Sequence, residues 1–168
     1  MNKLSLELGN RSAEISECGT YRYSLRRQWA EGYQVLFVML NPSTADALAG
    51  DPTIRRCVGF AKSWGFSQLA VANLFALRST DPHVLMRCGD IDPVGPRNDE
   101  AIIGLAEEST MIVAAWGNHG IFLGRSKEVR RILGATSCLY HLGLTKSGQP
   151  RHPLYLPGDT QPGWWPQP

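Results

Sequence analysis

The sequence predicts an α/β protein: a three-layer α/β/α sandwich with a central, mainly parallel four-stranded sheet. The first observation behind this prediction is the stretch 35–40, where six consecutive apolar residues suit a strand that is buried on both faces. The second is that similar apolar stretches at 68–75 and 110–116 alternate with helical patterns. A strand buried on both faces needs cover on both, so helices are expected on each side of the sheet.

Length and composition favour one domain over residues 1–168. The chain has 168 residues, of which 43% are hydrophobic and 19% are charged, as in ordinary globular proteins. A net charge of +2 is too small to indicate nucleic-acid binding by itself. No apolar stretch approaches the roughly 20 residues that cross a bilayer, and the amino terminus lacks a signal-peptide pattern. We expect a cytoplasmic protein.

The four cysteines, Cys18, Cys57, Cys88 and Cys138, are far apart in the sequence and include no Cys-x-x-Cys pair. This spacing indicates neither a zinc site nor an iron-sulfur cluster. We expect buried free thiols, no metal and no cofactor.

The first 30 residues are predicted to form a small antiparallel extension. Residues 4–8, 13–16 and 21–29 have strand-like patterns, with a turn signal at Gly9 and Asn10. Three arginines of the third segment, Arg22, Arg26 and Arg27, give it a basic face. This face is interpreted either as a solvated strand surface or as a phosphate-binding surface.

Helices are predicted after each buried strand. Asp51 followed by a proline predicts a helix start, and the helix is expected over 53–64. A short helix is expected after Pro82, and a longer one over 95–108. A basic amphipathic helix follows, with Arg125 among its outward residues and phosphate contact as an alternative to simple solvation.

The carboxyl-terminal part is predicted to contain one more strand, over 137–142. A flexible basic loop is expected over 145–153, and an irregular tail rich in proline and glycine over 157–168. The paired tryptophans of this tail are expected to pack onto the body of the protein.

Polar residues follow the predicted strands where each strand ends. These are Asn41, Pro42, Ser43 and Asp46 after the first strand, Asn73 and Arg78 after the second, and Asn118 and His119 after the third, while Lys146, Arg151 and His152 lie in the basic loop. In open α/β sheets the carboxyl ends of the strands form the ligand-binding edge. Most of these groups are amides, hydroxyls and imidazoles, which suit the binding of a neutral heteroaromatic ring and of a delocalised anion.

The sequence contains none of the common phosphate-loop, dinucleotide-binding, nucleophile-elbow and zinc-protease motifs.

Two family resemblances rest on these motifs. Leu-Asn-Pro-Ser-Thr-Ala-Asp at 40–46 and Arg-His-Pro-Leu-Tyr-Leu at 151–156 resemble the bacterial and phage family called domain of unknown function 1643. The order of strand, Asn-Pro, strand, Asn, and finally His-Pro also resembles the uracil-DNA glycosylase superfamily, especially its mismatch-specific uracil/thymine branch. The second resemblance implies a glycosylase-like fold and a DNA or nucleotide-like ligand.

The glycosylase resemblance also implies roles for individual residues. Asn41 would position the attacking water, Asn73 would pair with the pyrimidine, and His152 would support the departing base. Leu154 or Tyr155 would press into a duplex. The positions at the strand ends and in the basic loop, rather than the resemblance, add Pro42, Ser43, Asn118 and Arg151 as substrate contacts, with Asp46, Arg78, His119 and Lys146 in supporting positions.

Other interpretations remain open at this stage. Asn41 and Ser43 also suit turn chemistry beside a proline, and Asn73 suits a hydrogen bond to a neighbouring loop. Met39 and Leu154 depart from the glycosylase pattern, which normally has Gly and Ser there. These departures favour, as the alternative, a binding module without catalysis, and a small-metabolite enzyme on the same architecture is a third hypothesis.

Overall fold

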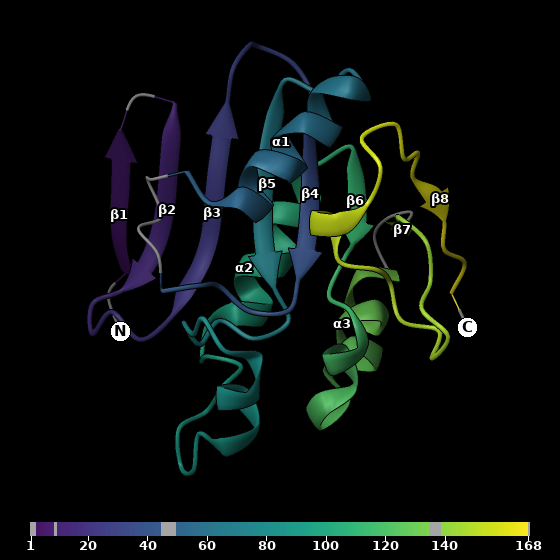
Figure 1. Cartoon of the computed structure of the whole chain (residues 1–168). Coiled ribbons are helices and arrows are strands. Elements are labelled where there is room, and N and C mark those ends of the chain that lie inside the picture. The colour runs from purple at the N-terminus through teal and green to yellow at the C-terminus, as the bar shows by residue number, and fades with distance from the viewer. Residues whose placement is uncertain (1–2, 9, 45–49, 135–138, 168) are drawn as a thin grey trace.

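The computed structural model describes residues 3–8, 10–44, 50–134 and 139–167. Eight strands in this part of the chain form one mixed sheet in the order β1-β2-β3-β5-β4-β6-β7-β8 (Figure 1). Their bounds are β1 Lys3–Leu8, β2 Arg11–Ser16, β3 Arg22–Gln28, β4 Gln34–Met39, β5 Gln68–Asn73, β6 Met111–Ala114, β7 Leu139–His141 and β8 Gly163–Trp164. The prediction of an α/β protein is confirmed.

The four strands β5, β4, β6 and β7 pair in parallel and form the centre of the sheet. Strand β4 lies between β5 and β6, and all six of its residues are buried, as the apolar stretch predicts. Parallel pairing brings the carboxyl ends of these strands to one edge.

The antiparallel extension is continuous with this sheet, because β3 pairs antiparallel with β5. The first residue of β3, Arg22, therefore lies at the same edge as the carboxyl end of β5, where its backbone N–H donates to Ala76 O at 2.9 Å. The interpretation of this strand as a solvated surface is wrong for two of its three arginines. Arg22 and Arg27 are buried and only Arg26 reaches the surface, where it pairs with Glu108 at 2.6 Å.

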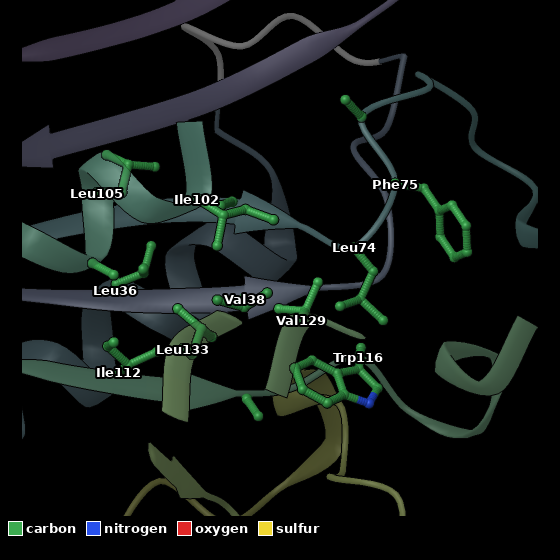
Figure 2. Packing of buried hydrophobic residues seen from close by; sticks show 14 of the residues in the cluster. Leu36, Val38, Leu74, Phe75, Ile102, Leu105, Ile112, Trp116, Val129 and Leu133 are labelled. Atoms are coloured by element: carbon green, nitrogen blue, oxygen red, sulfur yellow. The ribbon is translucent and has the colours of Figure 1, made fainter. Parts of the chain in front are cut away.

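Helices cover both faces of the sheet (Figure 1). Helix α1 (Pro52–Ser63) buries Ile54, Cys57 and Phe60 against the β4 side chains that point to one face. Helices α2 (Asn98–Glu107) and α3 (Arg125–Gly134) pack on the opposite face, where Figure 2 shows Ile102, Leu105, Val129 and Leu133 beside Leu36 and Val38. Successive β4 residues point to opposite faces, so one apolar stretch supplies both cores.

The predicted start of α1 is confirmed to within one residue, and a side chain caps this helix. Helix α2, predicted from residue 95, begins at Asn98 and has no side-chain cap. Asp51 caps α1 by accepting from Thr53 N at 2.7 Å and Ile54 N at 3.3 Å. Three 3-10 helices lie in the connections: η1 Pro82–Arg87, η2 Asn118–Gly124 and η3 Pro153–Tyr155. The predicted outward position of Arg125 is wrong, because this side chain is buried between α3 and the end of β5.

The carboxyl-terminal tail is more regular than predicted. Its β8 pairs antiparallel with β7, so the tail adds an edge strand to the sheet. Trp165 is buried against the body, as expected, whereas Trp164 is exposed. The first two residues of the strand predicted over 137–142 lie outside the described residues. In the described part of the chain, no helix is both long and apolar enough to span a membrane.

Candidate ligand-binding site at the carboxyl edge of the sheet

A pocket of about 360 Å³ lies at the carboxyl ends of β4, β5 and β6. The start of α1 and the loop that precedes η3 complete its wall, so segments far apart in the sequence meet there. Its volume is at the lower end of the roughly 300–1,000 Å³ of small-molecule sites. The position agrees with the general rule for open α/β sheets.

Asn41 contributes an amide oxygen to this pocket. Its Nδ2 donates to Ser79 O at 2.9 Å and to Pro42 O at 3.2 Å, which fixes the orientation of the amide. Oδ1 makes no hydrogen bond with any described residue, and Asn41 lines the pocket. The side chain therefore both holds the loop at 79 and offers an acceptor to a ligand or a water.

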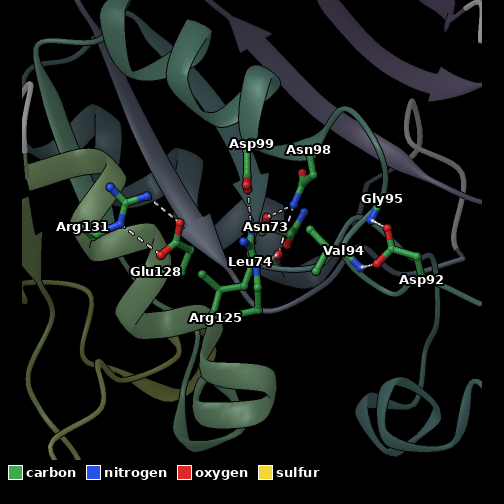
Figure 3. A network of polar contacts seen from close by, with 10 residues as sticks. All are labelled: Asn73, Leu74, Asp92, Val94, Gly95, Asn98, Asp99, Arg125, Glu128 and Arg131. Atoms are coloured by element: carbon green, nitrogen blue, oxygen red, sulfur yellow. Dashed lines mark hydrogen bonds and ion pairs between the residues drawn. The ribbon is translucent and has the colours of Figure 1, made fainter.

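Asn73, the last residue of β5, lies deeper in the pocket wall and is only 4% exposed. Its side chain makes no hydrogen bond within the described residues, while its backbone O accepts from Asn98 Nδ2 at 2.9 Å. The next carbonyl, Leu74 O, accepts from Asn98 Nδ2 and Arg125 Nε, each at 3.0 Å (Figure 3). Asn98 and Arg125 thus hold the end of β5 from the opposite face, and the Asn73 amide is left for the pocket.

Asp51 brings a carboxylate to the pocket, a contribution beyond the cap that its sequence predicts. Oδ1 accepts from the first turn of α1, and Oδ2 accepts from the Ser43 hydroxyl at 3.2 Å. Both residues line the pocket. Ser43 is thereby oriented by a hydrogen bond, and negative charge lies near the ligand space.

His152 lines the pocket as a neutral imidazole. Its Nδ1 accepts from Leu154 N at 3.3 Å, so in the neutral ring the proton is on Nε2. Partial desolvation by the surrounding protein lowers the pKa of His152, although Asp51 acts in the opposite direction. A neutral ring with a protonated Nε2 is a hydrogen-bond donor without a positive charge.

Arg22, like Asp51, is a charged pocket residue that the sequence-based site prediction did not include. It is 6% exposed and lines the pocket, and its side chain makes no hydrogen bond or ion pair with the described residues. The sequence signal was a basic strand with phosphate binding as one interpretation. Only the antiparallel pairing of β3 with β5 shows which arginine of that strand reaches the pocket.

The pocket brings together seven of the residues predicted from the sequence. These are Asn41, Pro42, Ser43, Asn73, Asn118, His119 and His152. His119 also lies edge-on to His83, with ring centroids 5.3 Å apart. Asn118 is exposed, and its Oδ1 accepts from the Thr145 hydroxyl at 2.6 Å.

The other predicted residues lie elsewhere. Arg78 donates to Gly19 O at 3.0 Å, Arg151 donates to Leu144 O at 3.3 Å, and Lys146 is exposed outside the pocket. Leu154 and Tyr155 are in η3, outside the pocket lining, where Tyr155 is 91% exposed. Asp46 lies outside the described residues.

The cysteines do not gather with other ligating side chains. Among the described residues, no group of three His, Cys, Asp or Glu side chains is arranged to hold a metal ion. The described cysteines have free thiols, with Cys57 buried and Cys88 partly buried. Cys18 is exposed, so the expectation of uniformly buried thiols is wrong; Cys138 is outside the described residues.

A model of the family described as Protein of unknown function (DUF1643) matches residues 22–154. The chain belongs to this family. The family match begins at Arg22 and includes every pocket residue named above. No curated protein and no solved structure matches the chain. Membership in this family brings no activity with it, and the comparisons give no support to the resemblance to the uracil-DNA glycosylase superfamily.

Proposed function

We propose that this protein hydrolyses the N-glycosidic bond between a base and a sugar, in a nucleotide or in DNA. The observation that carries the proposal is the buried, ligand-facing amide of Asn73, which has no side-chain partner among the described residues. A buried amide without a partner is costly, and a ligand that hydrogen-bonds to it removes that cost. A pyrimidine edge presents one acceptor and one donor, as O4 and N3–H, and an amide offers the complementary pair.

Asn41 would position the attacking water. Its Nδ2 is engaged by the Ser79 carbonyl, so Oδ1 is held at a fixed place as an acceptor. In the reaction the water oxygen forms a bond to the sugar C1′, and the bond from C1′ to the base nitrogen breaks. The bonding electron pair leaves with the base, which takes up the proton that the water loses.

His152 and Asp51 would stabilise the charges that develop. Positive charge grows on the sugar as the bond breaks, and negative charge grows on the base oxygen. The neutral His152 ring can donate from Nε2 to that oxygen. The Asp51 carboxylate supplies the opposite charge for the sugar in the same pocket.

The test is base release from substrates that contain uracil, mismatched thymine, hypoxanthine or hydroxymethyluracil. Each base is offered in duplex DNA, where thymine is mismatched, and also in single-stranded DNA and as a free nucleotide, and release is measured by abasic-site cleavage or by chromatography of the free base. Asn41→Ala should abolish release while leaving ligand binding largely intact. Asn10→Ala, which changes an exposed asparagine outside the pocket lining, is the matched control. Full activity of Asn41→Ala on a verified substrate would remove Asn41 from the mechanism.

A binding module without catalysis is the second candidate. Met39 favours it, because this side chain lines the pocket where the glycosylase pattern has glycine. The methionine reduces the space beside Asn41 in which a sugar must approach. This candidate predicts salt-sensitive binding to the same oligonucleotides with no base released.

A further inference from the structure

The buried, unpartnered guanidinium of Arg22 is a second site inside the pocket, separate from the amides that would read a base. We propose that Arg22 binds the terminal phosphate of a free nucleoside monophosphate. The inference rests on the proposed function for the nucleoside part of the ligand, whereas the anion site stands on Arg22 itself.

Arg22 has the burial of a core residue without the partners of one. It is 6% exposed, and its side chain makes no hydrogen bond or ion pair with the described residues. Asp51, the carboxylate in the described pocket lining, accepts hydrogen bonds from the first turn of α1 and from Ser43. Buried charges in proteins are normally paired, so a ligand anion is the missing partner.

The charges around Arg22 also favour an anion. Desolvation lowers the pKa of Arg22 to about 10, and Arg78 and Arg27 act in the same direction, while Asp51 opposes them. At neutral pH the guanidinium is still protonated, and two arginines act on it against one carboxylate. A dianionic phosphate supplies the opposite charge and accepts two parallel hydrogen bonds from the guanidinium fork.

The depth of Arg22 favours a terminal phosphate over a phosphodiester of a long strand. A group that reaches a side chain this deeply buried must enter the pocket as the end of a small ligand. An internal phosphodiester carries a nucleotide on both sides and bears only one charge. The pocket volume of about 360 Å³ agrees with a single small ligand.

The experiment measures binding by isothermal titration calorimetry at constant ionic strength. The probes are deoxyuridine, thymidine, deoxyadenosine and deoxyguanosine, their 5′-monophosphates, and a single-stranded 12-mer without a terminal phosphate. In the wild-type protein at least one monophosphate should bind at least tenfold more tightly than its nucleoside. Arg22→Gln should lose this preference, and Arg22→Lys should retain part of it because the charge remains without the planar fork. Arg26→Gln removes an exposed arginine from the same strand and should keep the full preference.

Thermal unfolding shows whether Arg22 acts only as a structural residue. Because Arg22→Gln removes an unpaired buried charge, the variant should melt at the same or a higher temperature in the absence of ligand. Inorganic phosphate should raise the melting temperature of the wild-type protein more than that of Arg22→Gln.

Several results would overturn the inference. The first is equal affinity for every monophosphate and its nucleoside, and the second is a preference for the monophosphate that survives in Arg22→Gln. The third is tighter binding of the 12-mer than of every monophosphate. The fourth is that no monophosphate binds and inorganic phosphate leaves the melting temperature unchanged. Base release separates this failure from that of the proposed function. Arg22-dependent monophosphate binding with no base released would refute the hydrolysis and keep the anion site. Base release that is equally fast with and without the 5′-phosphate would refute the anion site and keep the hydrolysis.

Discussion

Arg22 and Arg125 are equally buried, each at 6% exposure, yet their surroundings differ. Arg125 pairs with Asp99 at 2.7 Å and donates to Leu74 O at 3.0 Å, so its charge and one N–H are satisfied by the protein (Figure 3). Arg22 lies in the pocket at the same edge of the sheet and has no side-chain partner among the described residues. One arginine fixes the end of β5, and the other is available to a ligand.

The same contrast holds for two asparagines. Asn98 donates from Nδ2 to two backbone carbonyls, at 2.9 and 3.0 Å, and helps to fix the end of β5. Asn73, whose own carbonyl is one of those two, turns an unpaired amide to the pocket. The Oδ1 of Asn98 is buried without a hydrogen-bond partner, so the two bonds that its Nδ2 donates, together with its position outside the pocket lining, mark Asn98 as structural.

The largest expected effect comes from removing the partner of Arg125. Asp99→Ala should lower the free energy of unfolding by about 3 kcal/mol, because it leaves a buried arginine without its counter-charge. Urea denaturation measures the change. Glu128→Ala is the matched control, because Glu128 and Asp99 are similarly exposed, each lies in the first turn of a helix, and each pairs with an arginine at 2.7 Å. Since Arg131 is exposed, the control should cost less than about 1 kcal/mol. Equal losses in the two variants would remove the distinction between a buried and an exposed partner.

The next effect separates the two asparagines. Asn98→Leu should lower the free energy of unfolding by about 2 kcal/mol, because the carbonyls of Asn73 and Leu74 lose a donor. Asn73→Leu should change stability by less than about 1 kcal/mol, because no described side-chain hydrogen bond is lost, but it should abolish ligand binding. Chemical denaturation and calorimetry on both variants provide the measurements. A larger loss of stability for Asn73→Leu than for Asn98→Leu would contradict the assignment.

A smaller effect is expected from the histidine of the pocket. The pKa of His152 is lowered in the folded protein, so the unfolded chain binds this proton first as the pH falls. Stability should therefore decline as the pH falls below about 6.5, the ordinary pKa of histidine, towards the lowered value, and His152→Gln should show a shallower decline. Thermal unfolding between pH 5 and 8 measures it. The pKa of His141 is also lowered, by burial, so part of the decline should persist in the variant. An identical pH dependence in His152→Gln would mean that His152 makes no contribution.

The smallest effect concerns the reactivity of the cysteine thiols rather than the stability of the protein. Hydrogen bonds from Ser16 and Thr20 lower the pKa of the exposed Cys18 thiol to about 7, whereas burial raises the pKa of Cys57. Iodoacetamide at pH 7.5 should modify Cys18 in the native protein and leave Cys57 unmodified, as read by peptide mass spectrometry. Ser16→Ala should slow the modification of Cys18. If Cys57 reacts as fast as Cys18, partners and burial do not control thiol chemistry in this protein.

Much of the fold follows from local patterns in the sequence. The apolar stretch at 35–40 predicted the central strand, and Asp51 followed by proline predicted the start of α1, because strand burial and helix capping depend on neighbouring residues. The polar residues that follow the strands indicated the edge where the pocket lies. The tail strand β8 was missed because two residues paired at a sheet edge leave no pattern of their own.

The sequence by itself determined the α/β class, the order of the strands as far as β7 and of the helices between them, and a set of amides and imidazoles at the strand ends. Only the tertiary structure decided which polar residues have partners. Arg22 and Arg125 both belong to basic stretches that look solvated in the sequence, and both are buried. Whether such an arginine has a partner depends on residues far along the chain, such as Asp99 for Arg125, so the local sequence carries no information about it. Pairing of β3 with β5, a long-range contact, is what brings Arg22 to the pocket.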